Sequence, residues 1–519
     1  MEMTTFLEVT DLTFRYFEQS KHNILNHVSL TAAANKTTVF IGPSGCGKST
    51  LAAVLAGLYP ENGGFLAGGQ IRLLGQPLEG LKPSKRAKLL SLLFQNPDLQ
   101  FCMDTLREEL RFCMENLSID PGEMDGRIAA LAEEMHLVPL LDRKLHTLSG
   151  GEKQKAALCC LFAIGSRGLF LDEPFANIDG PSARQLIESL RSRKESDGLT
   201  ILAIDHRLEH WLSLADEFVI LGTGGQVIKR GITPSTLPEY EELFRAQGIY
   251  FPRSLSRYKS CDRTNSVIPK ESAPAITLDN LSLSQIASDK AKRRKKSDET
   301  VPLLLENVQA SFESGTITAI LGPSGAGKTS LFYTLLGRRP YTGSIVVRGR
   351  ELKTIKPKVL YRELGMVFQN PGSQFITQNV LEEVSESLRL WNQKEDPKAL
   401  LREFGLDAYA KYSPYMLSQG QQRRLAVLSM VAGGQQILLL DEPTYGQDER
   451  SARALMEMLT KRVEQNGLTV ILITHDEELA AQYAHRCYRL ADRRLLPLQP
   501  QNHPGDIPEK GGNSKPWSI

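Results

Sequence analysis

The sequence predicts an α/β protein with two similar domains in tandem, each combining an antiparallel β subdomain, a parallel-sheet core and a helical subdomain. Three observations predict this fold. The chain repeats itself over most of its length, strongly apolar segments alternate with helical patterns, and each half carries a glycine-rich loop between a strand and a helix. A duplicated α/β module accounts for all three.

The internal repeat is clearest in an eight-residue phrase, FQNPDLQF at 94–101, which returns as FQNPGSQF at 368–375. The offset there is 274 positions (368 − 94), and Ser149, Asp172 and His206 match residues 269 positions later (418 − 149). A duplication on this scale predicts a first domain over 1–252, a linker over 253–273, a second domain over 274–498 and a flexible C-terminal tail over 499–519.

Composition limits the function classes. The 519 residues carry a net charge of only +2, which gives no general case for nucleic-acid binding. The seven cysteines include no CxxC pair, which excludes a zinc ribbon or disulfide framework and fits reduced cytosol. No basic region precedes an apolar run at the N-terminus, and no apolar stretch approaches about 18 residues, so we expect neither a signal peptide nor a membrane span.

Apolar periodicity indicates the layers of each domain. Alternating segments at 6–17 and 275–285 predict antiparallel strands. Continuous apolar runs, TTVFIG, GLFLDEP and TILAIDH in the first copy and TITAILG, QILLLDEP and TVILITH in the second, alternate with helical patterns and predict buried parallel strands. Helical segments between each FQNP phrase and the later LSxG phrase predict an inserted helical subdomain.

The glycine-rich loops predict phosphate binding. GPSGCGKST and GPSGAGKTS each follow an apolar strand and open a helix, so backbone N–H groups and a helix N-terminus face the ligand. Lys48 and Lys328 would reach the β- and γ-phosphates, and Ser49 and Thr329 would bind Mg²⁺. The predicted nucleotide-binding residues are Gly42, Pro43, Ser44, Gly45, Cys46, Gly47, Lys48, Ser49, Thr50, Gly322, Pro323, Ser324, Gly325, Ala326, Gly327, Lys328, Thr329 and Ser330.

Acidic pairs and histidines follow the apolar runs. Asp172 and Asp441 fit the role of holding Mg²⁺, while the adjacent glutamates, Glu173 and Glu442, would polarise the attacking water. One histidine ends the next apolar run in each half, where its side chain can reach the γ-phosphate. The predicted catalytic residues are Glu173, Glu442, His206 and His475.

A serine–glycine phrase opens a later helix in each half, as LSGGEKQ at 148–154 and LSQGQQR at 417–423. Locally this is a helix cap, and a serine hydroxyl, a bare backbone and a helix N-terminus together also form an anion site. The residues concerned are Ser149, Gly150, Gly151, Ser418 and Gly420.

With these motifs in this order, each half resembles an ABC-type ATPase domain. The resemblance implies ATP and Mg²⁺ as cofactors, and two composite sites in an intramolecular pseudo-dimer, each combining one domain's glycine-rich loop with the other domain's serine–glycine phrase. It places Tyr16 on the adenine. The implied metal-site residues are Ser49, Gln95, Asp172, Thr329, Gln369 and Asp441.

The chain departs from the family pattern in three places. Gln419 replaces the first glycine of the second LSGGQ-like phrase, and Gln285, the counterpart of Tyr16, cannot stack on a base. The D-loops read ANID and YGQD but keep Asp179 and Asp448. Because both glutamates and both histidines are present, we expect both sites to hydrolyse ATP, at unequal rates.

Several kinds of ABC protein fit this arrangement. A soluble ABC-F-like ATPase acting on ribosomes also has two domains, but its interdomain segment is a long helical arm, and here the basic run at 290–299 lies inside the second domain. A DNA-repair ATPase of the UvrA kind would carry zinc modules, and tandem sugar-import ATPases commonly have a degenerate second glycine loop.

The FQNP phrases favour an importer. FQNPxxQ followed by DTLREEL or TQNVLEEV resembles the ATPases of energy-coupling-factor (ECF) transporters, and LSQGQ with EPTYGQD is similar to the hydroxymethylpyrimidine/thiamine import group. This resemblance implies a peripheral protein on the cytoplasmic side of the cell membrane. It also implies an integral membrane T component and a substrate-binding S component as partners, and no nucleic acid. Residues 96–101 and 370–375 would help shape the groove for the membrane partner, and Phe101 and Phe375 are expected to line it.

Overall fold

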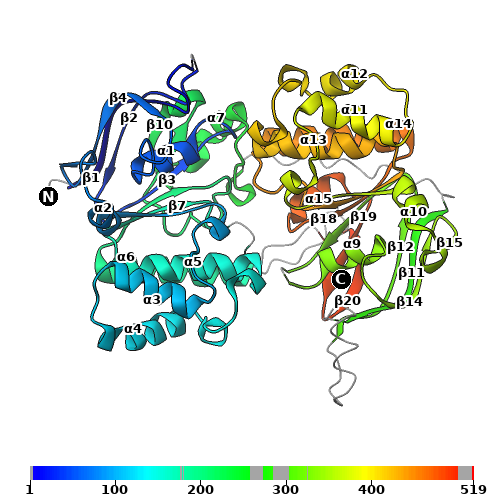
Figure 1. The fold of residues 1–519 in the computed structure, drawn as a ribbon, viewed down its shortest axis with the longest axis horizontal. Helices are drawn as coiled ribbons and strands as arrows, with labels where there is room; N and C mark the ends of the chain where they lie inside the picture. Colours follow the sequence, from blue (N-terminus) through cyan, green and yellow to red (C-terminus); the bar gives the residue numbers. More distant parts are fainter. Residues whose placement is uncertain are drawn as a thin grey trace. The chain divides into compact units, whose positions relative to one another are not determined.

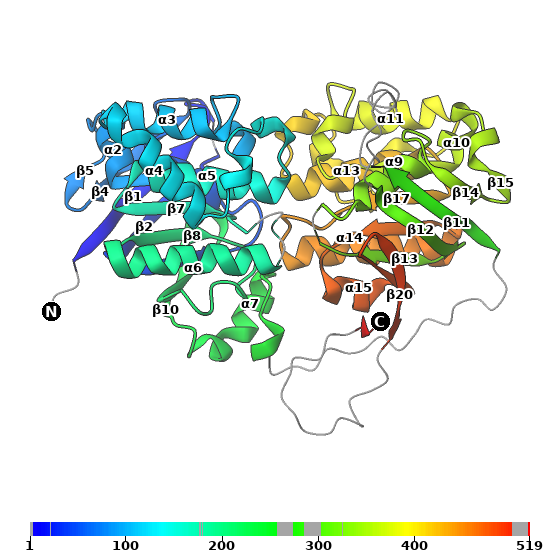
Figure 2. The same ribbon diagram turned by 90° about the horizontal axis from the view of Figure 1, so that it is seen from below.

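The computed structural model describes residues 4–20, 22–175, 178, 180–256, 273–284, 303–323, 325–500 and 517–518. The chain forms two compact units that part near residue 259 (Figures 1 and 2). Most of the predicted linker, the basic run at 290–299 and most of the predicted C-terminal tail lie outside the described residues, as do Gln285, Ser324 and Asp179.

The first unit opens with the predicted antiparallel sheet, in the order β2-β1-β4-β5. Its strands are β1 (Thr5–Arg15), β2 (Leu25–Ala33), β4 (Phe65–Leu73) and β5 (Gln76–Pro77). Leu7, Val9 and Leu12 of β1 are buried, whereas Glu8 and Thr10 are exposed, because successive side chains of a strand point to opposite faces. The alternation in the sequence therefore marks a half-buried sheet.

The second sheet of this unit has the order β10-β9-β3-β8-β7-β6. Its strands are β3 (Thr37–Ile41), β6 (Leu90–Leu93), β7 (Gly168–Asp172), β8 (Thr200–Ile204), β9 (Glu217–Leu221) and β10 (Val227–Ile232). Strands β6, β7, β8, β3 and β9 are parallel to one another, and β10 pairs with β9 antiparallel. Strands β9 and β10 extend the sheet beyond the apolar runs that the sequence singled out.

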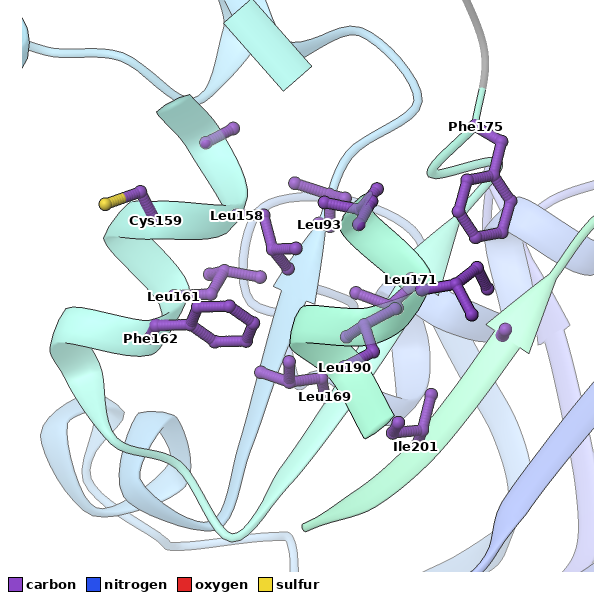
Figure 3. Close-up of a cluster of buried hydrophobic side chains, with 14 of the residues drawn as sticks. Leu93, Leu158, Cys159, Leu161, Phe162, Leu169, Leu171, Phe175, Leu190 and Ile201 are labelled. Atoms are coloured by element: carbon purple, nitrogen blue, oxygen red, sulfur yellow. The ribbon is translucent and has the colours of Figure 1, made fainter. Parts of the chain in front are cut away.

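Two hydrophobic cores lie on opposite faces of the parallel sheet. Val39 and Ile41 of β3 pack with the helices on one face, while Phe40 packs with helix α1 (Lys48–Leu55) and the antiparallel sheet on the other. Figure 3 shows the helical side, where Leu169 and Leu171 of β7 face side chains of α5. The helices of this unit are α1, α2 (Pro83–Leu89), α3 (Leu106–Asn116), α4 (Pro121–Glu134), α5 (Gly150–Ile164), α6 (Gly180–Asp197) and α7 (Glu241–Gln247).

The second unit repeats this plan. Its antiparallel sheet, in the order β12-β11-β14-β15, comprises β11 (Pro274–Ser284), β12 (Leu303–Glu313), β14 (Thr342–Val347) and β15 (Arg350–Glu351). The larger sheet, in the order β16-β17-β18-β13-β19-β20-β21, comprises β13 (Ile317–Leu321), β16 (Leu364–Val367), β17 (Ile437–Asp441), β18 (Thr469–Ile473), β19 (Arg486–Ala491), β20 (Arg494–Pro500) and β21 (Trp517–Ser518).

The helices of the second unit occupy matching positions in the chain. They are α9 (Lys328–Leu335), α10 (Pro357–Glu363), α11 (Val380–Leu390), α12 (Pro397–Glu403), α13 (Gln419–Ala432), α14 (Glu449–Asn466) and α15 (Glu477–Tyr483). The pairs α3–α4 and α11–α12 form the predicted helical subdomains. Among the described helices, none combines the length and the apolar character that crossing a bilayer requires.

Candidate functional site

The two glycine-rich loops join β3 to α1 and β13 to α9. Gly47 and Gly327, just before each helix, have φ values of 102° and 104°, a left-handed conformation that glycine adopts without strain. The Lys48 Nζ donates to the carbonyl oxygens of Gly42 (2.8 Å) and Pro43 (3.0 Å), and Lys328 makes the matching bonds. Each ammonium therefore lies inside its loop, where a phosphate would meet it.

A carboxylate at the end of a parallel strand lies beside each loop. Thr329 Oγ1 donates to Asp441 Oδ2 at 2.8 Å, and Ser49 bonds to Asp172 in the first unit. Among the described residues, the buried Oδ1 of Asp172 has no hydrogen-bond partner. Burial raises the pKa of Asp172 to about 7, with the Glu173 charge adding to it, and burial raises the pKa of Asp441 to about 6. A hydroxyl and a buried carboxylate with a free oxygen fit a hard divalent cation.

This carboxylate predicts a pH-dependent stability effect. A carboxyl whose folded pKa is raised stabilises the fold at low pH and loses that contribution as pH rises from about 4 to about 7. In metal-free protein, Asp172→Asn should therefore raise Tm at pH 8 by about 2–4 °C, with a smaller difference at pH 5.5. Differential scanning fluorimetry with a chelator measures this.

Asp441→Asn is the matched control, because the pKa of Asp441 is raised less. Its gain in Tm at pH 8 should be smaller than that of Asp172→Asn. A Tm for Asp172→Asn below that of the natural chain at pH 8 would contradict the assignment of Asp172 as a destabilised carboxylate.

The predicted catalytic glutamate of the first unit is held on both sides. The distance from Glu173 Oε1 to His206 Nε2 is 3.0 Å, and Gln95 Nε2 donates to Glu173 Oε2 at 2.8 Å. Burial alone would raise the pKa of Glu173, but the His206 charge and the hydrogen bonds of His206 and Gln95 bring it below its ordinary value. An ionised carboxylate in this position can accept a proton from water.

Both glutamates adopt a strained backbone. Glu173 has a φ of 51° and Glu442 a φ of 50°, in the left-handed region that residues with a Cβ seldom occupy. Strain of this kind persists where the surrounding structure enforces it, and it concentrates at functional sites.

The histidine contact differs in the second unit. There His475 meets Glu442 Oε2 through Nδ1 at 3.0 Å, and its side chain is 50% exposed against 11% for His206. The buried Asp205 orders the first histidine by accepting from the backbone N–H groups of His206 and Arg207 and from Trp211 Nε1. Asp205 is aligned with a threonine, Thr474, in the second unit. The sequence signal for Asp205 is therefore only the difference between IDH at 204–206 and ITH at 473–475.

The serine–glycine phrases begin helices α5 and α13. Ser149 and Ser418 are the N-caps, each in a capping box with the residue three positions later. Gln419 occupies the first helical position and leaves this cap intact. Ser149, Gly150, Gly151, Ser418 and Gly420 are thus placed at helix N-termini as predicted.

The second serine–glycine phrase ends at Arg423, for which the sequence motifs predict no role. The buried Arg423 donates to the carbonyl oxygens of Glu442 and Gln369, and its guanidinium lies 5.6 Å from the centre of the Tyr445 ring. It thereby ties α13 to the predicted catalytic glutamate and to the FQNP loop. Its aligned residue in the first unit is the buried Gln154.

The repeated FQNP phrase is a compact loop. Asn96 Oδ1 accepts from Asp98 N, and Asn370 Oδ1 accepts from Gly372 N, both at 3.1 Å, so each asparagine caps a short 3₁₀ turn. In the second unit, Gln374 Oε1 also accepts from Phe368 N at 2.8 Å and closes the base of the loop. The repeated letters therefore specify a loop conformation.

A buried glutamate fastens the exit of each loop. Glu109 Oε2 accepts from the backbone N–H groups of Cys102 and Met103, at 2.8 and 2.7 Å. Glu383 Oε2 does the same for Ile376 and Thr377. Because Glu109 and Glu383 lie on α3 and α11, each loop is anchored to its helical subdomain.

An apolar side chain is exposed inside the first loop and directly after the second. Leu99 is 74% exposed and Ile376 is 83% exposed. The expectation that Phe101 and Phe375 line this surface is wrong for Phe375, which is 7% exposed and packs in the core. Phe101 also packs against a hydrophobic core. Leu99 lies inside the first phrase and Ile376 directly follows the second, so the two are not aligned residues. For brevity we call them the loop-tip residues.

Known proteins resemble the chain over most of its length. The ABC transporter family model matches residues 25–176 and 305–445. A Bacillus subtilis (strain 168) protein named "Putative HMP/thiamine import ATP-binding protein YkoD" is 34% identical over 94% of this chain and 90% of its own length. A Methanosarcina acetivorans protein named "Putative ABC transporter ATP-binding protein" is 32% identical over 96% of this chain and 87% of its own length.

Solved structures agree on the fold. One titled "RNase-L Inhibitor" matches 94% of this chain and 90% of its own length, with a TM-score of 0.60 and 20% identity. A ribosome-bound archaeal Pelota and ABCE1 model matches 94% of this chain and 78% of its own length, with a TM-score of 0.63 and 20% identity. At this identity the likeness concerns the fold. Two matched family domains, each with the glycine loop and acidic strand end described above, make this chain an ATP-binding member of the ABC transporter ATPase family with two fused ATPase domains.

Proposed function

We propose that the chain is the energy-coupling ATPase of an ECF-type membrane importer that takes up a vitamin or related micronutrient such as a thiamine precursor. The observation that carries the proposal is the FQNP loop, which an asparagine caps alike in both units. An exposed apolar side chain accompanies each loop, Leu99 inside the first and Ile376 directly after the second. The import name of the Bacillus subtilis relative supports the same class.

In the proposed cycle, each ATP lies between one domain's glycine loop and the other domain's serine–glycine helix. Lys48 and Lys328 bind the phosphates, and Glu173 and Glu442 take a proton from the attacking water. His206 and His475 hold the glutamates and reach toward the γ-phosphate. Mg²⁺, when bound through Ser49, Asp172 and Gln95 or through Thr329, Asp441 and Gln369, supplies charge neutralisation at the phosphates.

The proposed partners are an integral T component, docked at the loop tips, and an S component that binds the substrate. The chain would then be peripheral on the cytoplasmic side of the cell membrane. Because Gln95 contacts Glu173 and Glu109 anchors the same loop to α3, movement at the loop tip can reach the catalytic carboxylate through direct contacts.

Fractionation of cells expressing the tagged chain tests this proposal. We expect the chain to sediment with membranes when the genes for multispan and small hydrophobic partners are co-expressed, and to become soluble without them. Sucrose gradients with a non-hydrolysable ATP analogue test the alternative. Co-migration with ribosomes, together with independence from membrane partners, would overturn the importer assignment in favour of an ABC-F-like role.

A further inference from the structure

The first unit presents an aromatic surface beside its glycine loop. Tyr16 directly follows β1, and its hydroxyl bonds to Thr50 Oγ1 at 2.8 Å. Its ring meets that of Tyr59 edge-on with centres 5.8 Å apart, and Tyr16 is 42% exposed. An exposed ring fixed next to the phosphate loop can stack on a nucleotide base.

The second unit carries different residues at these positions. The counterpart of Tyr16 is Gln285, which lies outside the described residues. The counterpart of Tyr59 is Arg339, and a proline follows both Tyr59 and Arg339. Neither counterpart is aromatic, so neither offers the aromatic face that Tyr16 and Tyr59 offer in the first unit. Among the described residues of the second unit, a base-binding group would therefore come from a side chain of another kind.

Arg339 is fixed at the matching place. One guanidinium nitrogen donates to Ser330 Oγ, and Ser330 is the counterpart of Thr50, the residue that Tyr16 contacts. The other donates to the carbonyl oxygen of Ser284, the last residue of β11, at 3.2 Å. The guanidinium thus spans the same strand end and the same helix turn that Tyr16 joins in the first unit.

A guanidinium group has the properties that this position needs. It is planar and delocalised, it stacks on aromatic faces, and it is more weakly hydrated than an ammonium. Two hydrogen bonds fix its plane in advance, so little side-chain entropy is lost when a base stacks on it.

We infer that Arg339 is the base-binding side chain of the second nucleotide site, stacking on the adenine where Tyr16 serves the first. The inference rests on the assignment of residues 322–330 as a nucleotide site, as proposed above. It makes the two sites chemically different, with an uncharged aromatic platform in one and a cationic planar platform in the other.

The test compares a nucleotide with its triphosphate alone. In the full chain carrying Lys48→Ala, which disables the first loop, calorimetry measures the binding of ATP and of inorganic tripolyphosphate. Arg339→Ala should raise the Kd for ATP by about 5- to 30-fold, the range expected for a lost stacking contact. The Kd for tripolyphosphate should stay within about twofold, because the phosphate loop is untouched.

Three further variants identify the interaction. Arg339→Tyr should restore ATP affinity to within about threefold, because it returns a stacking face, whereas Arg339→Lys keeps the charge and should resemble Arg339→Ala. Arg338→Ala is the matched control, since that guanidinium lies 5.4 Å from the centre of the Tyr361 ring, and it should leave both affinities unchanged.

Different failures are distinguishable. Equal weakening of ATP and tripolyphosphate by Arg339→Ala, rescue by lysine in place of tyrosine, or unchanged ATP affinity would each overturn the role of Arg339. Failure of the Lys48→Ala parent to bind either ligand would overturn the second nucleotide site itself, and the role of Arg339 with it.

Discussion

Replacing both predicted catalytic glutamates, Glu173→Gln with Glu442→Gln, is expected to lower ATP turnover by about 10²–10⁴-fold, the contribution typical of a positioned general base. Each single variant should remove the turnover of its own site. We expect Glu173→Gln to cost more, because Glu173 is held by both His206 and Gln95, whereas the histidine at Glu442 is half exposed. Steady-state phosphate release from the purified full chain measures this.

ATP binding should survive in all three variants, since the amide is close in size to the carboxylate. Glu188→Gln is the matched control, because Glu188 is exposed and pairs only with its neighbour Arg191 in the described structure. If Glu442→Gln left turnover untouched while Glu173→Gln abolished it, the expectation that both sites hydrolyse ATP would be wrong.

The loop-tip variants Leu99→Asp and Ile376→Asp should uncouple transport from ATP hydrolysis. Both side chains are exposed, so a carboxylate there costs the isolated chain little, but burying it against an apolar partner without a counter-charge is unfavourable. We expect uptake of the imported substrate to fall about tenfold or more, while basal ATP turnover of the isolated chain is retained. Reconstitution with the membrane partners in liposomes provides both measurements.

Ile228→Asp is the matched control for these variants, because Ile228 is also an exposed aliphatic residue. It lies on β10, at the opposite edge of its sheet from β6, the strand that leads into the FQNP loop of the same unit. Its uptake should remain normal. Equal loss of uptake in Ile228→Asp, or a parallel loss of basal turnover in the loop-tip variants, would refute a docking role. Phe375→Ala is unsuitable for this test, because emptying a core position typically costs about 3–5 kcal/mol of stability.

Much of the fold could be predicted because its signals are local in the sequence. A glycine loop between a strand and a helix, an apolar run ending in Asp-Glu and a capping serine each specify their structure within about ten residues, and duplication repeated each signal. Strands β9 and β10 escaped prediction, because they carry no motif of their own and join the sheet through pairing, β9 with β3 and β10 with β9.

The candidate sites divide in the same way. The sequence by itself predicts which residues bind phosphate, hold a cation and activate water, because these roles require particular functional groups at fixed short spacings. Only the tertiary structure decided that Asp205 orders His206, that Arg423 joins α13 to Glu442, that Phe375 is buried and that Arg339 stands beside Ser330. The contacts of Arg423 and Arg339 join different parts of the chain, which no short motif encodes. Asp205 lies where the two copies have diverged, and the role of Phe375 is set by burial.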